Sequence, residues 1–337
     1  MSQDKHPRVG LDVGTSRVVL ARKAGEDYQF HSQLNAFVTL PFSKLTRSVL
    51  EKERIPHSVA GEEILVFGDA SERFADLFHV ETRRPMREGT LNPQEPDGLA
   101  VVRSIVELLA GPGEKAGHKL CYSVPAPPLG SREWGKFHEA ALGQMLSEAG
   151  YQVRALEEGL AVVFAELEQS NYTGIGISCG AGLSNVCLAY LSVPVVSFSL
   201  PTAGDRVDAE AARVAGEVAT RVRVLKEQYF TLNGQPDADA LPGKLRQALR
   251  VYYDDLIGRL VQAMTEAFQE QRDLPRLGRP IPVVLAGGSV LPAGFGERFQ
   301  QALRRSDFPL AVSEVRLASD PLHATAKGAL VAALADM

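Results

Sequence analysis

The sequence predicts an α/β fold of two related halves that share a cleft. Short apolar strands alternate with amphipathic helices, and two similar hairpins with glycine turns occur far apart in the chain. The glycine-containing segments do not mark a boundary between independent domains, so we expect the two halves to be interleaved. The 337 residues suffice for two domains of roughly 150 residues each.

The first hairpin opens the predicted fold. Val9–Val13 is an apolar strand, Gly14-Thr15-Ser16 forms a tight turn, and the apolar run Val18–Ala21 returns from it. Residues 32–80 contain only short apolar runs interrupted by proline and glycine, which argues against a long helix there. Asp97–Leu109 has apolar residues at helical spacing, with Asp97 in the position of an N-cap.

The middle of the chain predicts a strand, a helix and the second hairpin. Lys119–Val124 is a buried strand that ends before several prolines, and Ser131–Ala149 is an amphipathic helix followed by glycine. The strands Thr173–Ser178 and Ser184–Tyr190 flank the turn Cys179-Gly180-Ala181-Gly182. This hairpin repeats the plan of the first one, which indicates a weak internal repeat.

The remaining elements are two long helices and a third strand–turn–helix unit. We expect helices at Asp205–Tyr229 and Gly243–Gln271, and the second carries an apolar stripe that is typical of a core-facing surface. Ile281–Ala286 predicts a strand, Gly287-Gly288-Ser289 a turn, and Ala293–Arg304 a helix.

Composition excludes several classes of function. The net formal charge of −5 argues against a dedicated nucleic-acid binder and against a polybasic membrane anchor. We expect no direct membrane insertion, because no apolar stretch is long enough to span a bilayer. Three cysteines without a CxxC pair indicate a reducing, cytoplasmic compartment. The seven histidines lack metal-ligand spacing, which argues against a zinc site.

Three glycine-containing turns, each after an apolar strand, are the main chemical signal. Glycine lets backbone N–H groups surround an oxyanion, so such turns can hold phosphate. Asp12 precedes the first turn and can hold Mg²⁺ directly or through waters, although it can equally cap its own turn. The chain has no GxxxxGK[ST] motif, and the glycines of the second hairpin lead into a strand, which excludes a P-loop and a Rossmann fingerprint.

Taken together, seven segments resemble the actin-like ATPase superfamily in order and context, and most closely the bacterial actins MreB and MamK over nearly the whole chain. The matching segments are VGLDVGT (9–15), RPMREG (84–89), SVP (123–125), LEEG (156–159), AGD (203–205), LAGGS (285–289), and DPL (320–322) with AKGA (326–329). The resemblance implies an α/β actin-like ATPase fold, with two related domains around a nucleotide cleft, each with a mixed sheet and a subdomain insertion.

The resemblance also implies ATP and Mg²⁺ as cofactors, with Asp12 as the metal-binding residue. The residues implied to bind the cofactors are Asp12, Gly14, Thr15, Ser16, Ser178, Gly180, Ala181, Gly182, Gly204, Asp205, Arg223, Gly287, Gly288 and Ser289. Glu158 matches the catalytic glutamate that positions or activates water. Without the resemblance, Glu157-Glu158 also fits the charged first turn of a helix, which the helix dipole favours.

The second phosphate loop departs from the pattern of the family. Where relatives read DIGGGTTE, this chain has Ser178 in place of the aspartate, Leu183 in place of the first threonine and Asn185 in place of the glutamate. Gly180 and Gly182 remain, so phosphate binding is expected to survive. Whether Ser178 abolishes or only slows ATP hydrolysis stays open, because the missing carboxylate helps to hold Mg²⁺ and the attacking water.

The resemblance further implies a division of each half into a core domain and a small subdomain. The implied ranges are 1–31 with 82–155 and 313–337 for the first core domain, 32–81 for its small subdomain, 156–204 with 274–312 for the second core domain, and 205–273 for its small subdomain.

Three functions compete on these grounds. The first is an actin-like ATP-binding protein that polymerises into homopolymer filaments, with slow ATP hydrolysis. The second is a degenerate actin-like scaffold or regulatory module that holds nucleotide without turnover. A metabolic kinase on the same fold is the weakest, because it leaves the RPMREG segment unexplained.

Overall fold

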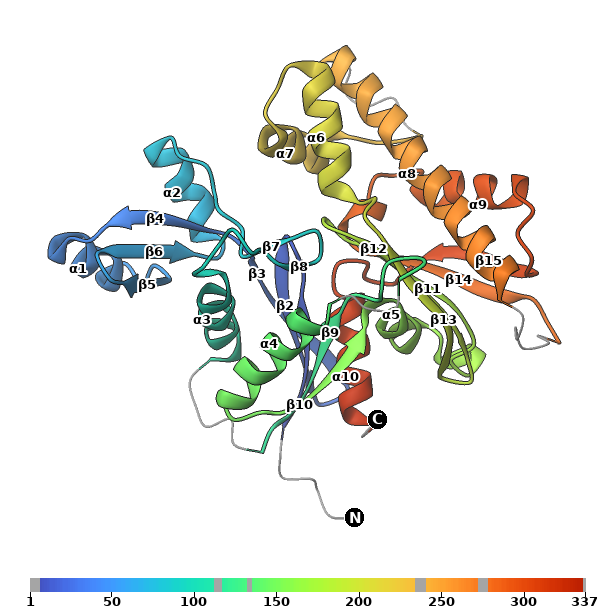
Figure 1. Ribbon diagram of the computed structural model, residues 1–337, viewed down its shortest axis with the longest axis horizontal. Helices are drawn as coiled ribbons and strands as arrows, with labels where there is room; N and C mark the ends of the chain where they lie inside the picture. The colour runs from blue at the N-terminus through green and yellow to red at the C-terminus, as the bar shows by residue number, and fades with distance from the viewer. Residues whose placement is uncertain (1–6, 112–116, 132–134, 234–240, 272–277, 336–337) are drawn as a thin grey trace.

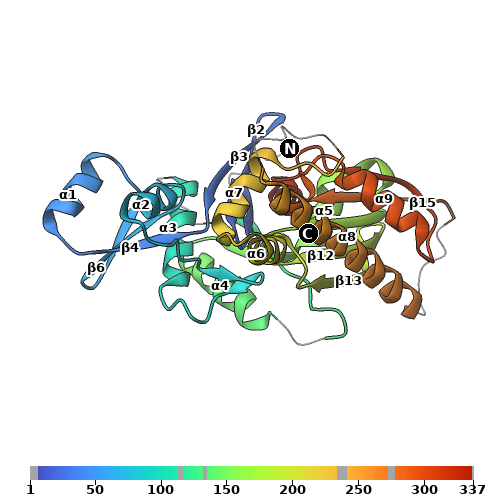
Figure 2. The same ribbon diagram turned by 90° about the horizontal axis from the view of Figure 1, so that it is seen from above.

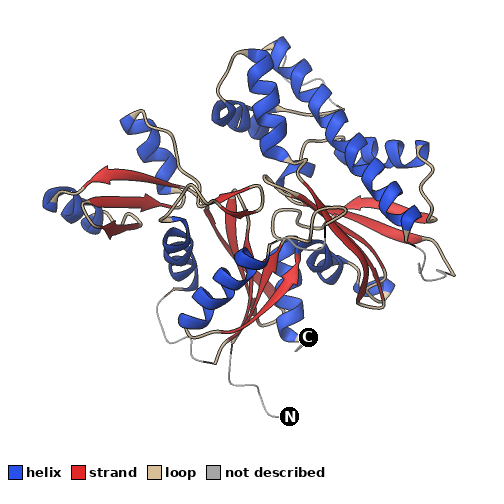
Figure 3. Ribbon diagram, viewed as in Figure 1, coloured by secondary structure: helices blue, strands red, loops and turns tan. Residues whose placement is uncertain are grey.

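Two five-stranded sheets of the same strand order form the core of the protein. The computed structural model describes residues 7–111, 117–131, 135–233, 241–271 and 278–335. In both sheets an antiparallel three-stranded meander is followed by two parallel strands. Figure 3 shows the two sheets side by side, with helices around them.

The first sheet has the order β3-β2-β1-β9-β10. Its strands are β1 (Arg8–Val13), β2 (Arg17–Ala24), β3 (Asp27–Leu34), β9 (Lys119–Val124) and β10 (Gln152–Glu157). β1 and β2 pair antiparallel, with Asp12 opposite Val19 and Val13 opposite Val18, which confirms the first predicted hairpin. The predicted strand at Lys119–Val124 is also confirmed.

The second sheet has the order β13-β12-β11-β14-β15. Its strands are β11 (Gly174–Cys179), β12 (Ser184–Tyr190), β13 (Val193–Leu200), β14 (Ile281–Ala286) and β15 (Val312–Leu317). β11 and β12 pair antiparallel, with Ser178 opposite Asn185, which confirms the second hairpin. Ser178 therefore takes the same place in this hairpin that Asp12 takes in the first.

The helices repeat the correspondence between the halves. The first half of the chain holds α3 (Gly98–Ala110), α4 (Lys136–Glu148) and α5 (Glu158–Glu166), and the second holds α8 (Gly243–Glu270), α9 (Phe295–Arg305) and α10 (Ala324–Leu334). α5 follows β10 but packs on β11 and β12, whereas α10 follows β15 but packs on β1 and β9. Each half thus contributes one helix to the core of the other, which is the predicted interleaving.

Two glycines allow the exchanged helix α10 to approach closely. A Cβ at Gly10 of β1 would lie 2.2 Å from the carbonyl oxygen of Ala326 in α10. A Cβ at Gly328 of α10 would lie 1.7 Å from the carbonyl oxygen of Ala161 in α5. Both separations are far below van der Waals contact, so only glycine fits at these positions.

Small units extend from each sheet and form two arms in Figure 1. The first holds the sheet β4-β6-β5, made of β4 (Phe37–Pro41), β5 (His57–Ala60) and β6 (Glu63–Phe67), with α1 (Lys44–Lys52) and α2 (Ala70–Phe78). The second is helical and consists of α6 (Gly204–Ala215), α7 (Ala219–Tyr229) and part of α8. A two-stranded ladder of β7 (Met86–Arg87) and β8 (Thr90–Leu91) follows the first arm. Figure 2 shows both arms from above.

The structure corrects several predicted boundaries. The single helix predicted at Asp205–Tyr229 is two helices, because Gly216 ends α6 in the left-handed conformation and Val218 is extended. The predicted helix at Ser131–Ala149 begins at Lys136, and residues 132–134 lie outside the described part. β15 pairs with β14, so this strand belongs to the second sheet rather than to the first core domain. The domain division as a whole stays a prediction.

None of the described helices has the length and apolar character needed to cross a membrane.

Candidate functional site

A cavity of about 460 Å³ lies between the two halves, and every predicted site residue lines it. These residues are Asp12, Gly14, Thr15, Ser16, Glu158, Ser178, Gly180, Ala181, Gly182, Gly204, Asp205, Arg223, Gly287, Gly288 and Ser289. They come from six separate stretches of the chain. The fold therefore brings the predicted site together in one place.

The cavity also has lining residues that the sequence analysis did not assign. They are Arg17, Val19, Ser32, Gly89, Leu183, Asp208, Lys226, Glu227, Leu291, Pro321, Leu322, His323 and Thr325. For some of them a signal was available: Asp208 lies three residues after Asp205, and Lys226 lies three residues after Arg223, so each shares a helix face with a predicted residue. Ser32 offers no such signal, because only the pairing of β3 with β2 brings it to the cavity.

The two hairpin turns have the same backbone design. The N–H of Gly14 donates to the carbonyl oxygen of Arg17 at 2.9 Å, and the N–H of Gly180 donates to that of Leu183 at 2.9 Å. In each turn, no described residue accepts a hydrogen bond from the two N–H groups that follow: those of Thr15 and Ser16, and those of Ala181 and Gly182. The cavity is thus lined by two equivalent pairs of unused donors.

The turns also touch each other across the cavity. The N–H of Gly89 donates to Oγ1 of Thr15 at 3.1 Å, and a Cβ at Gly182 would lie 2.5 Å from both of these atoms. A Cβ at Gly89 would lie 2.3 Å from Cδ1 of Leu183. Glycine at 89 and 182 is therefore what lets the two halves meet at this point.

The third glycine turn buttresses the second. The N–H of Gly287 donates to the carbonyl oxygen of Pro321 at 2.7 Å, and its φ of 93° favours glycine. Oγ of Ser289 donates to the carbonyl oxygen of Gly180 at 2.7 Å. The first two N–H groups of α6 are used in the same way, since Gly204 donates to Gly180 and Asp205 to Ala181. These contacts fix the shape of the second turn.

Two buried acidic side chains, Asp12 and Glu158, line the cavity near enough for their charges to interact. Oγ of Ser123, at the end of β9, donates to Oδ1 of Asp12 at 2.6 Å, and Oγ of Ser178 donates to Oε2 of Glu158 at 2.9 Å. Burial raises the pKa of Asp12, and the bond from Ser123 opposes this shift. Burial raises the pKa of Glu158 as well, and the nearby charge of Asp12 adds to it.

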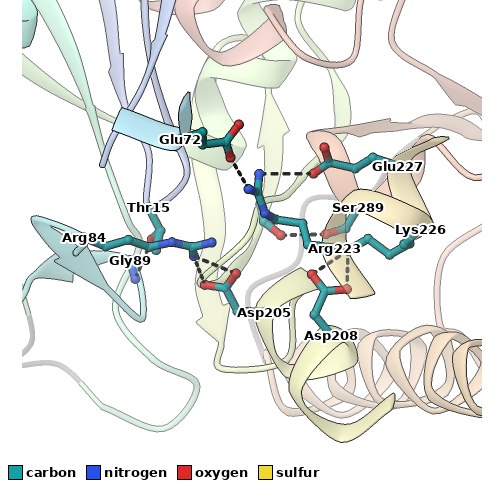
Figure 4. Close-up of polar contacts among 11 residues, drawn as sticks. Thr15, Glu72, Arg84, Gly89, Asp205, Asp208, Arg223, Lys226, Glu227 and Ser289 are labelled. Atoms are coloured by element: carbon teal, nitrogen blue, oxygen red, sulfur yellow. Dashed lines mark hydrogen bonds and ion pairs between the residues drawn. The ribbon is translucent and has the colours of Figure 1, made fainter. Parts of the chain in front are cut away.

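The α6–α7 wall of the cavity is charged, and its charges are mostly paired (Figure 4). Nζ of Lys226 lies 2.8 Å from Oδ1 of Asp208, and both side chains are buried. Asp205 accepts from Arg84, and Arg223 donates to Glu72, a residue of α2 in the opposite arm. Both of these pairs connect the two halves.

The fold is actin-like, with two related halves around a central cavity. A sequence model of the Volactin family matches residues 8–333, and the chain belongs to that family. No curated protein matches the chain in sequence.

Solved structures with the same fold include structures of MamK, MreB5 and EutJ. A MamK double helical filament has 18% sequence identity and a TM-score of 0.75, covering 99% of this chain and 99% of that chain. MreB5 of Spiroplasma citri bound to ADP has 16% identity and a TM-score of 0.65, covering 97% and 96%. The ethanolamine utilization protein EutJ from Carboxydothermus hydrogenoformans has 17% identity and a TM-score of 0.56, covering 98% and 91%. At these identities the likeness establishes the fold.

Proposed function

We propose that the protein binds ATP with Mg²⁺ in the central cavity. The observation that carries the proposal is the matched pair of hairpin turns, each of which lines the cavity with two unused backbone N–H groups. Such donors suit the oxygens of a phosphate chain. The cavity volume of about 460 Å³ lies within the range of small-molecule sites, roughly 300–1,000 Å³. The related MreB5 structure is bound to ADP, which supports the same class of ligand here.

Asp12 and Glu158, which line the cavity, fit a magnesium ion. Mg²⁺ prefers oxygen ligands and is usually held by one or two carboxylates together with phosphate oxygens. Asp12 and Glu158 are buried carboxyl groups that repel each other, so a divalent cation beside them would relieve the repulsion. When bound, the ion would neutralise charge on the phosphates. Of the two, Asp12 would hold it.

Slow hydrolysis is the second part of the proposal. Glu158 is the group that would orient the attacking water, and its Oε2 accepts a hydrogen bond from Ser178. Where relatives have an aspartate, this chain has the neutral hydroxyl of Ser178, and that hydroxyl already donates a hydrogen bond to Glu158. One positioned carboxylate is therefore missing, and turnover should be slow. A nucleotide-binding scaffold without turnover is the alternative that this same substitution favours.

We also propose that the protein assembles with copies of itself into filaments in the cytoplasm. A filament of one chain needs a head-to-tail contact that does not close into a ring. The related MamK structure is a double helical filament, and the likeness to it covers 99% of both chains. The three cysteines are free and buried, in keeping with the reducing compartment expected from the sequence.

Calorimetry tests the proposal of nucleotide binding. The wild type should bind ATP in the presence of Mg²⁺, and Gly182→Val should lose this binding because its side chain would collide with Thr15 and Gly89. Gly258→Ala is the matched control, because a Cβ at Gly258 in α8 meets open space. Absence of ATP binding by the folded wild type would refute the proposal.

Pelleting tests assembly separately. Sedimentation over a series of protein concentrations with ATP should show a critical concentration above which polymer forms. A monomer at every concentration and in every nucleotide state would refute assembly and would favour the nucleotide-binding scaffold instead.

A further inference from the structure

Two ion pairs join the halves of the molecule at the edge of the cavity. In each pair one residue lines the cavity and belongs to the helical arm: Asp205 on α6 and Arg223 on α7. Its partner belongs to the other half and does not line the cavity: Arg84 for Asp205 and Glu72 for Arg223. Figure 4 shows both contacts, with Glu72 and Arg84 reaching toward the helical arm.

The pair Glu72–Arg223 connects α2 of the first arm with α7 of the helical arm. Glu72 lies in the first turn of α2, and its Oε1 accepts a hydrogen bond from the guanidinium of Arg223. The Arg223 side chain is only 11% exposed, and its other near carboxylate, Glu227, lies 3.8 Å away on the same helix. Because the guanidinium is largely removed from water, its bond to Glu72 is less screened than a surface ion pair.

The pair Arg84–Asp205 lies closer to the phosphate turns. Nη1 of Arg84 is 2.9 Å from both carboxylate oxygens of Asp205. The backbone N–H of Asp205 donates to the carbonyl oxygen of Ala181, so the same residue is tied to the second turn. Arg84 thus connects the first half directly to the element that shapes the second turn.

We propose that Glu72 and Arg84 are positioning residues that latch the two halves together over the cavity. A nucleotide can then enter or leave only when both ion pairs open. That the latch controls a nucleotide rests on the proposed function. The latch itself belongs to the protein alone, so the separation of the arms can be measured without nucleotide.

The first experiment measures the separation of the arms without nucleotide. Spin labels are placed through Leu77→Cys on α2 and Val218→Cys before α7, which are 67% and 60% exposed. The native cysteines are buried and resist labelling, because burial raises the pKa of each thiol to about 12.

The double variant Glu72→Gln/Arg84→Gln should lengthen and broaden the distance distribution between the labels. The control is Asp76→Asn/Arg87→Gln, which removes an exposed carboxylate from α2 and an exposed arginine near Arg84 without touching either ion pair. This control should leave the distribution unchanged. An unchanged distribution in the folded latch variant would overturn the proposal.

The second experiment measures the exchange of a fluorescent ATP analogue with Mg²⁺. Each single variant should release it about 5-fold faster, and the double variant about 20-fold faster, as expected for loss of one and two half-buried ion pairs. Association should accelerate too, because the open cavity admits ligand more readily. Faster release with unchanged association would indicate only a disturbed binding surface and would overturn the latch. If the wild type binds no nucleotide, the proposed function fails, and the label distances still decide whether the latch exists.

Discussion

The two hairpin turns share a backbone and differ in side chains, and this contrast organises the site. Asp12 and Ser178 take equivalent places in their hairpins, each one pair before the end of the ladder. Arg17 and Leu183 are likewise equivalent, since each accepts the hydrogen bond that closes its turn. The duplicated backbone supplies the same donors twice, whereas the charged side chains stand only in the first turn. Under the proposed function, phosphate binding would rest on the shared backbone and metal binding on the side chains that differ.

The difference between the two turns also affects Glu158, the acidic group that would orient the attacking water. In the first hairpin the carboxylate of Asp12 accepts a hydrogen bond from Ser123, and in the second the hydroxyl of Ser178 donates to the carboxylate of Glu158. The second turn thus has a supporting role. The predictions below test this asymmetry and the acid stability of the first half, beginning with the largest expected effect.

Removing the carboxylate of Glu158 should affect turnover most. Glu158→Gln keeps the size of the side chain and its hydrogen-bonding capacity toward Ser178, but it cannot take a proton from water. We expect phosphate release to fall by about 10²–10⁴-fold. ATP affinity should stay within about 3-fold of the wild type, a difference below about 1 kcal/mol, because Glu158 would act on the water and not on the nucleotide. Glu157→Gln is the control, since Glu157 precedes the helix and does not line the cavity. Equal rates in both variants would place the catalytic group elsewhere.

A buried histidine should make the stability of the first half depend on pH. His138 in α4 is 2% exposed, and its Nδ1 accepts a hydrogen bond from the N–H of Leu91 at 3.3 Å. Burial lowers its pKa to about 4. The unfolded chain therefore binds the proton more tightly, and folding stability should fall as pH drops from about 6.5 to about 4, by about 3 kcal/mol in total.

Chemical denaturation at pH 7 and pH 4.5 measures this effect. His138→Gln should remove that part of the pH dependence, because the amide can still accept from Leu91 and does not titrate. The exposed His31→Gln is the control and should keep the wild-type dependence. If His138→Gln follows the wild-type curve, the loss of stability in acid has another source.

Asp12 and Ser178 should differ in what they contribute to metal-dependent binding. Asp12→Asn should weaken ATP binding in Mg²⁺ by about 1–3 kcal/mol, the cost of a charge-assisted contact. Its effect in the presence of a chelator should be small. Ser178→Ala should cost less than about 1 kcal/mol in binding, because the Ser178 hydroxyl is bonded to Glu158 and carries no charge toward the metal. Calorimetry with and without Mg²⁺ separates them, and equal losses would mean that both turns reach the metal.

How far the sequence could predict this site depends on how local each signal is. The glycine turns and hairpin strands are local patterns, so Gly14, Gly180 and Asp12 could be placed before the fold was known. The break at Gly216 also has a local cause, but the apolar spacing on either side of it conceals two helices as one. The pairs Arg84–Asp205 and Glu72–Arg223 join residues 121 and 151 positions apart, and no pattern in either segment encodes the partner.

The smallest predicted effect concerns Arg17, the charged counterpart of Leu183. Three arginine and lysine side chains line the cavity, and two of them have close partners: Arg223 with Glu72, and Lys226 with Asp208. Nη1 of Arg17 lies 3.8 Å from Oδ1 of Asp69, which is too long for a hydrogen bond, and both side chains are substantially exposed. Arg17 is therefore the lining cation most available to a phosphate.

Arg17→Gln should weaken ATP binding by about 1 kcal/mol, or roughly 5-fold, because a partly exposed charge is screened by water. The loss should be smaller for ADP, negligible for adenosine, and should shrink as salt is raised. Leu183→Gln, the same side chain at the equivalent position of the other turn, should show no such gradation among the three ligands. Equal weakening of ATP and adenosine by Arg17→Gln would instead mean that the arginine shapes the cavity without meeting phosphate, and the two turns would then differ only at Asp12 and Ser178.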